Sequence, residues 1–175
     1  MGIREISENI TAFIQQGKSR QDIFDQLVKS APAEAGKIAY CIASVPEEQV
    51  RKKYLYFNAS LCVLLVIYSI LNMVSGLPIE PDEPTLFLLI TTVIPLIFCY
   101  FVFRFHGGIY RLSGLWFLID LSETLILASS SDSLSALKVM ALCTIVFLSF
   151  FIGRKVFPGM GFVGPRKDKS GNYIL

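Results

Sequence analysis

The segment that most constrains this chain is residues 112–130, an apolar run that contains two carboxylates, Asp120 and Glu123. An α-helix of these 19 residues would be about 28 Å long, which is the thickness of the hydrocarbon core of a bilayer. A carboxylate near the centre of such a helix costs about 2.5–3.5 kcal/mol on insertion scales. The two acids are three residues apart, so they share one helical face. We expect this face to point toward protein or water rather than toward lipid.

Three further apolar segments flank this run, and the four together predict an all-α, polytopic membrane protein. The composition agrees, because 53% of the residues are hydrophobic and 17% are charged, whereas soluble domains are about 25% charged. The predicted connections on one side, at 77–85 and 131–134, are short and carry no Lys or Arg. The predicted transmembrane domain covers residues 53–155. Its four helices are predicted at about 54–76, 86–103, 112–130 and 135–153.

The ends of the chain are more polar. Residues 1–52 repeat apolar side chains at helical spacing, which predicts a short cytoplasmic helical cap. Its first helix, with Ile6 and Ile10 on one face, packs on protein or lies in the lipid interface. Residues 156–175 form a glycine-rich cytoplasmic tail with apolar residues that favour docking, and with turn signals for a short hairpin near 169–172.

The distribution of basic residues predicts the orientation. Fifteen of the sixteen Lys and Arg residues lie before the first predicted transmembrane helix, between the second and the third, or after the fourth; Lys138 is the exception. The positive-inside rule therefore places both termini in the cytoplasm. The chain opens with a polar, amphipathic segment instead of a cleavable signal peptide, and we expect a location in a bacterial inner membrane.

Asp120, Glu123 and Lys138 are the candidate ion-pair residues inside the membrane. Lys138 lies in the fourth predicted helix, and its long side chain is predicted to reach Glu123 and form a salt bridge. Two interpretations of the acids stay open. They are structural groups that bind neighbouring helices, or they form a site that binds protons or cations.

The remaining candidates are polar or helix-breaking residues within the predicted spans. Asn58, Tyr68 and Asn72 lie on one face of the first span, where they serve as interhelical hydrogen-bonding groups or line a polar interior. Pro95 lies in the middle of the second span and predicts a structural kink, with a gating hinge as the alternative. The side chains of Thr91 and Thr92 are expected to help satisfy the carbonyl that Pro95 frees.

No motif in the sequence indicates an enzyme. Catalytic signatures of hydrolases, metalloproteases and nucleotide-binding proteins are absent, and no catalytic residue, metal ligand or cofactor is expected. The four cysteines form no CxxC pair, and we expect them to be small buried hydrophobic residues. His106 stands in a turn beside Arg104 and Arg111, where an interfacial or lipid-headgroup role fits better than catalysis. No nucleic-acid partner is indicated.

Two function classes follow from these observations. The first is a non-enzymatic interaction or assembly component, either a subunit of a membrane complex or an immunity-type protein. Its partner is another protein or a second copy of the chain, bound through the transmembrane domain or the N-terminal cap. The alternative is a channel or an ion- or proton-coupled transporter subunit that uses Asp120 and Glu123.

Overall fold

The described part of the protein is all-helical, as the sequence predicts. The computed structural model describes residues 6, 10, 12–14, 16–75, 85–127, 133–162 and 164–175, and only the backbone at 85–89 and 127. Within these residues there is no strand, only two isolated β-bridges near the C-terminus. The elements are α2 (Arg20–Ser30), η1 (Pro32–Glu34), α3 (Ala35–Ser44), α4 (Glu48–Lys53), α5 (Leu55–Ser75), α6 (Thr85–Phe103), α7 (Ile109–Leu127) and α8 (Ser133–Val156).

Two of the described helices, α5 and α8, are long and apolar enough to cross a membrane. The prediction of four such helices is therefore supported only in part. In α6 the described apolar stretch is the shorter Ile90–Phe103. Helix α7 begins at Ile109, three residues before its predicted start, and so includes Arg111 in addition to Asp120 and Glu123. The predicted loops over 77–84 and 128–132 and most of the first predicted helix lie outside the described residues.

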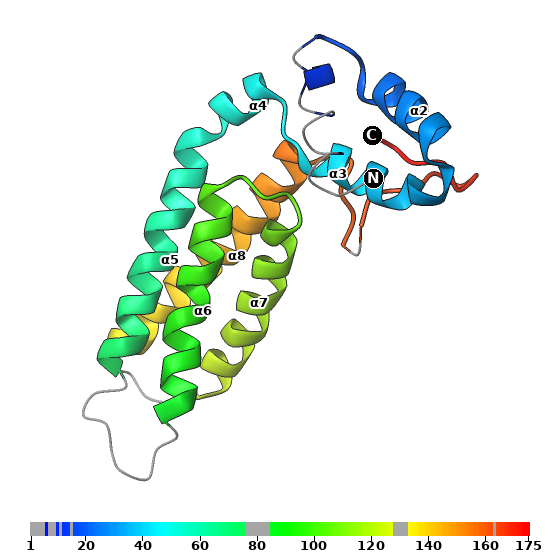
Figure 1. The fold of residues 1–175 in the computed structure, drawn as a ribbon. Coiled ribbons are helices and arrows are strands. Elements are labelled where there is room, and N and C mark those ends of the chain that lie inside the picture. The colour runs from blue at the N-terminus through cyan, green and yellow to red at the C-terminus, as the bar shows by residue number, and fades with distance from the viewer. Residues whose placement is uncertain are drawn as a thin grey trace.

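The four long helices lie side by side, with α2 and α3 at one end of the bundle (Figure 1). Helix α5 packs along both α6 and α8, and α7 packs along α8. Far fewer residues of α6 and α7 approach each other, although these two helices are consecutive in the chain. The seam between α6 and α7 is therefore the loosest long contact of the bundle.

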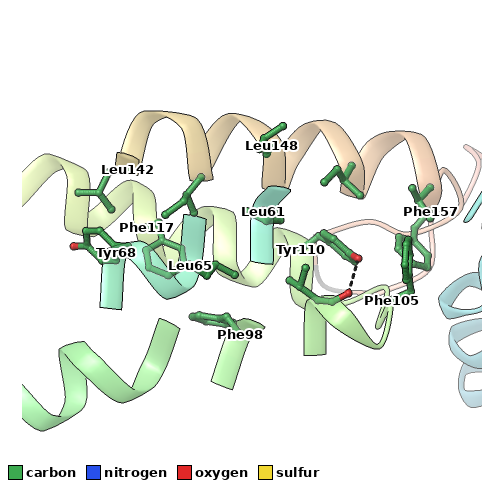
Figure 2. Close-up of a cluster of buried hydrophobic side chains, with 14 of the residues drawn as sticks. Leu61, Leu65, Tyr68, Phe98, Phe105, Tyr110, Phe117, Leu142, Leu148 and Phe157 are labelled. Carbon is green, nitrogen blue, oxygen red and sulfur yellow. Dashed lines mark hydrogen bonds between the residues drawn. The ribbon is translucent and has the colours of Figure 1, made fainter. Parts of the chain in front are cut away.

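Aromatic and aliphatic side chains from all four helices form the core of the bundle (Figure 2). Phe117 of α7 is at its centre, with its ring edge-on to Tyr68 at 5.7 Å and to Phe98 at 5.6 Å between ring centroids. Edge-to-face pairs of this kind contribute about 0.5–1.5 kcal/mol each beyond the burial of apolar surface. Leu61 and Leu65 of α5 lie in the same core and are fully buried.

A second, separate hydrophobic core belongs to the N-terminal module, which we define as the described residues before α4. Ile6 and Ile10 are fully buried there against side chains of α2 and α3, on the face that the sequence predicts to be apolar. Gly17, with φ of 77°, ends the preceding helical turn. The Oγ atom of Ser19 then caps α2 by accepting a hydrogen bond from the backbone N–H of Asp22, at 3.1 Å.

The C-terminal tail joins the two cores. Phe157 is buried in the bundle core, whereas Leu175 packs against both the bundle and the N-terminal module. The ring of Tyr173 meets Phe24 of α2 edge-on at 5.4 Å between centroids. Near its tip the tail turns back on itself, where the backbone N–H of Asp168 donates to the carbonyl of Asn172 at 2.8 Å. The tail is thus a structural link between α8 and the module.

The turn between α6 and α7 packs against both α3 and the C-terminal tail. Phe105 has a φ of 55°, a left-handed conformation that is rare for a bulky residue, and its side chain is 3% exposed. Two backbone hydrogen bonds around it close the end of α6. A Cβ atom on Gly107 would lie 2.9 Å from the Phe157 ring and 3.1 Å from the Cα atom of Ser44. Glycine is required here because α3 and the tail press against the turn.

Candidate functional site

Pro95 interrupts the backbone hydrogen bonding of α6, and polar side chains of α5 donate hydrogen bonds to the carbonyls at this point. Proline has no N–H, so the carbonyl of Thr91, four residues earlier, loses its helical donor. The Nδ2 atom of Asn72 donates to this carbonyl at 3.1 Å. One turn away on α5, the hydroxyl of Ser69 donates to the carbonyl of Thr92 at 2.7 Å. The sequence predicts that Thr91 and Thr92 of α6 help at this point, but the Thr92 hydroxyl is buried without a hydrogen-bond partner among the described residues, and α5 supplies the donors described above.

Asp120 of α7 is bound by α5 as well, through Tyr68, which lies one helical turn before Asn72. The hydroxyl of Tyr68 donates to the Oδ2 atom of Asp120 at 2.5 Å, across the space between α5 and α7. A hydrogen bond to a carboxylate is stronger than one between neutral groups. Asp120 is half-buried, and its backbone carbonyl also accepts from the Thr124 hydroxyl at 2.8 Å. This carboxylate is therefore held in one position by the bundle.

Lys138 of α8 interacts electrostatically with Asp120 at a distance longer than a salt bridge, whereas the side chain of Glu123 is exposed. Lys138 is half-buried, and the carboxylate that acts on it electrostatically is Asp120. The described residues show no Glu123–Lys138 salt bridge, and the side chain of Glu123 is exposed. Residues three apart on a helix are rotated by about 60°. That rotation is enough to turn Asp120 toward α5 while Glu123 points out of the bundle.

Both carboxylates line a groove at the seam between α6 and α7. The groove has a volume of about 220 Å³. Its apolar walls include Pro95 and Trp116, and the Trp116 side chain is 42% exposed. We call it the α6–α7 groove; its lining is Ile90, Thr91, Pro95, Trp116, Ile119, Asp120 and Glu123. It is an apolar depression on the side of the bundle with two acids at its edge.

A second polar layer crosses the bundle nearer to the N-terminal module. Asn58 donates from Nδ2 to the carbonyl of Val102 at 3.0 Å and accepts from the Tyr110 hydroxyl at 2.6 Å. The same hydroxyl lies 3.1 Å from the Val102 carbonyl, the contact drawn as a dashed line in Figure 2. Ser113 of α7 and Ser149 of α8 are both fully buried, with their hydroxyls 3.3 Å apart.

Sequence reasoning placed Asn58 between helices but missed its partners. Tyr110 precedes the predicted start of the third helix at 112, but it lies inside α7. No motif in the sequence singles out Ser149. Its available signal was position: it stands seven residues after Leu142 and seven before Val156, which are both buried on the same face of α8.

The described residues contain no group of three or more His, Cys, Asp or Glu side chains that could hold a metal ion. All four cysteines are free thiols. Cys62 and Cys99 face each other across α5 and α6, each with its sulfur within 4 Å of the backbone carbonyl of the other. They act as packing residues at this contact.

Comparisons of the chain with known protein families, with curated proteins and with solved structures found no match.

Proposed function

We propose that this protein is a four-span integral membrane protein that acts as a non-enzymatic interaction or assembly component and binds its partner within the bilayer. The single observation that carries the proposal is the exposed Glu123 in the α6–α7 groove. A carboxylate on the outer face of a transmembrane bundle is expensive unless another group pairs with it. A partner helix that supplies a hydrogen-bond donor or a cation meets this need.

The surface of the bundle supports the membrane placement. Large apolar side chains are exposed on all four long helices, including Ile70 on α5, Ile97 on α6, Ile119 on α7 and Met140 on α8. The buried positions, in contrast, include polar residues such as Asn58. A soluble bundle has the reverse distribution, with charged residues outside. Apolar side chains on both the inner and outer faces are typical of helices whose solvent is lipid.

The position of the tail supports an even number of crossings. Leu175 packs on the N-terminal module, so the described beginning and end of the chain lie at the same end of the bundle. Four crossings place both ends on one side of a membrane. The basic residues at that end then put it in the cytoplasm under the positive-inside rule, and a bacterial inner membrane remains the proposed location.

Site-specific photo-crosslinking in the native host tests this function. A photoreactive phenylalanine analogue at Trp116, in the groove, should form an adduct of one discrete mass. The same analogue at Met140, which is 68% exposed on α8, is the matched lipid-facing control and should give none. Glu123→Gln should weaken the Trp116 adduct. Equal adducts at both positions, or an adduct unaffected by Glu123→Gln, would contradict the proposal.

The alternative function is a channel or an ion- or proton-coupled transporter subunit. It is favoured by the hydrogen-bonded Asp120 beside Lys138, because ionisable groups within a membrane often mark ion pathways. Ion or proton flux in proteoliposomes that Asp120→Asn abolishes, in a normally folded protein, would establish this function in place of the first.

A further inference from the structure

A second cavity lies at the opposite end of the seam, between α3 and the turn that joins α6 to α7. Its volume is about 510 Å³, which lies within the usual range for sites that bind small molecules, about 300–1,000 Å³. We call it the α3 cavity. Its walls come from two parts of the molecule and include Lys37, Tyr40, Cys41, Arg104, Phe105 and His106.

The charge of the α3 cavity is one-sided. Lys37 and Arg104 are permanent cations, His106 lies beside Arg104, and no carboxylate belongs to the lining. Lys37 also pairs with Glu34 of η1 at 3.8 Å, but its side chain is 64% exposed. Such an exposed pair is worth about 0–1 kcal/mol, so the ammonium group remains available to an anion.

The remaining walls are apolar. Tyr40 and Val45 line one side, and the buried Phe105 lines the other. A free inorganic anion would gain nothing from these walls, and it would fill a small part of the volume. A ligand that joins a phosphate to a glyceryl or alkyl group fits both the cationic and the apolar surfaces.

The cavity lies at the level of an interfacial belt. Tyr100 and Phe103, next to Arg104 on α6, are 55% and 71% exposed, and Tyr56 on α5 is 82% exposed. The guanidinium carbon of Arg104 lies 5.3 Å from the centroid of the Tyr100 ring, within the distance of about 6 Å at which a cation is attracted to an aromatic face. Aromatic and basic residues gather in this way where a membrane protein meets lipid headgroups.

We propose that the α3 cavity binds the headgroup of an acidic phospholipid of the cytoplasmic leaflet. Arg104 and Lys37 contact the phosphate, and the glycerol and first acyl carbons pack on Tyr40 and Phe105. The proposal rests on the membrane placement proposed above, and it is independent of any partner at the α6–α7 groove.

Cys41 provides a reporter inside the cavity. Burial raises the pKa of its thiol, so its alkylation is best followed at mildly alkaline pH, where enough thiolate is present. The full-length protein in detergent is titrated with phosphatidylglycerol, phosphatidylcholine or inorganic phosphate, and the alkylation rate is read at each cysteine by peptide mapping. Cys143, exposed on α8, is the internal control.

Phosphatidylglycerol should slow the alkylation of Cys41 by about threefold or more at saturation, while phosphatidylcholine and inorganic phosphate leave its rate unchanged. The rate at Cys143 should not depend on the headgroup. Equal protection by both lipids overturns the proposal, and so does equal protection by inorganic phosphate, which would assign the cavity to a free anion.

A pair of variants identifies the cationic groups. Lys37→Gln with Arg104→Gln should abolish the protection by phosphatidylglycerol. Lys52→Gln with Lys53→Gln, which removes the same charge outside the cavity, should retain it. Protection that persists in the first pair overturns the assignment. Because the comparison of lipids uses the unaltered chain, it decides the proposal even if the variant pair fails to fold. Normal crosslinking at Trp116 with no lipid selectivity would reject the lipid site alone and leave the proposed function standing.

Discussion

The two polar layers of the bundle contain similar side chains but differ in what they leave unpaired. In the layer near the module, Asn58 and Ser113 are at most 2% exposed and hydrogen-bonded within the bundle. The side chains that form its hydrogen bonds, Asn58, Tyr110, Ser113 and Ser149, are all neutral. In the layer near Pro95, the hydrogen bonds of Asn72 close the helix break, yet two carboxylates and Lys138 remain at or near the surface. The first layer is complete within the chain, and the second is not.

This difference separates a structural role from a functional one. A closed layer fixes the rotation of each helix, because a slip would leave buried donors and acceptors unpaired. A layer that retains an unpaired charge at the outer surface stabilises the fold less than a layer whose polar groups are all paired. We propose that contacts outside the chain account for such a residue, which is why the proposed interaction site lies at Glu123 and not at Asn58.

The largest effect is expected in the closed layer. Asn58→Asp replaces the donor that faces the Val102 carbonyl with an oxygen, and it buries a carboxylate in the core of the bundle. We expect a loss of about 3–5 kcal/mol in the free energy of unfolding. Loss of helical circular dichroism in a detergent titration measures it. A change below 1 kcal/mol would mean that this layer is not closed.

The next effect concerns the helix break. Asn72→Leu removes the donor to the Thr91 carbonyl, which should cost about 1–3 kcal/mol. Pro95→Ala restores a backbone N–H to α6, so Asn72→Leu should be less damaging in that background than in the original chain. Unfolding of the four proteins in a double-mutant cycle measures this coupling. Additive losses would show that Asn72 acts through packing and not through the freed carbonyl.

Particular residues show how far the sequence could predict this structure. The all-α fold and the approximate helix ranges follow from long apolar runs separated by turn residues such as Gly17 and Gly107. The sequence predicts a start at 112, after the charged Arg111, whereas α7 begins at Ile109 and Arg111 is buried within it. The location of the buried Ile6 and Ile10 was predictable because they recur at helical spacing.

The partners of the candidate site were not predictable from periodicity. Helical spacing shows that Asp120 and Glu123 share a broad face, but it does not give the rotation of α7 against α5. That rotation decides which of the two acids meets Tyr68 and Lys138. The contact of Asn72 with the Thr91 carbonyl depends in the same way on how far α5 and α6 are shifted along each other. These contacts are tertiary, and no local signal encodes them.

A smaller effect tests which acid accompanies Lys138. Lys138→Met should destabilise the protein by about 1 kcal/mol, because it leaves Asp120 without its neighbouring cation. In an Asp120→Asn background the loss should nearly vanish, since the amide oxygen still accepts from Tyr68 and carries no charge. In a Glu123→Gln background the loss should be unchanged. Coupling to Glu123 instead of Asp120, measured from unfolding of these variants, would restore the ion pair expected from sequence.

The smallest effect on stability belongs to Glu123, and it is the most informative about function. Because its side chain is exposed and forms no ion pair among the described residues, Glu123→Gln should change the free energy of unfolding by no more than about 0.5 kcal/mol. The same substitution should nonetheless weaken partner capture at Trp116. Asp120→Asn is its control, because it alters the inward-facing acid of the same groove and should leave capture largely intact. A strong loss of stability in Glu123→Gln would make Glu123 a structural residue like Asn58 and erase the contrast between the layers.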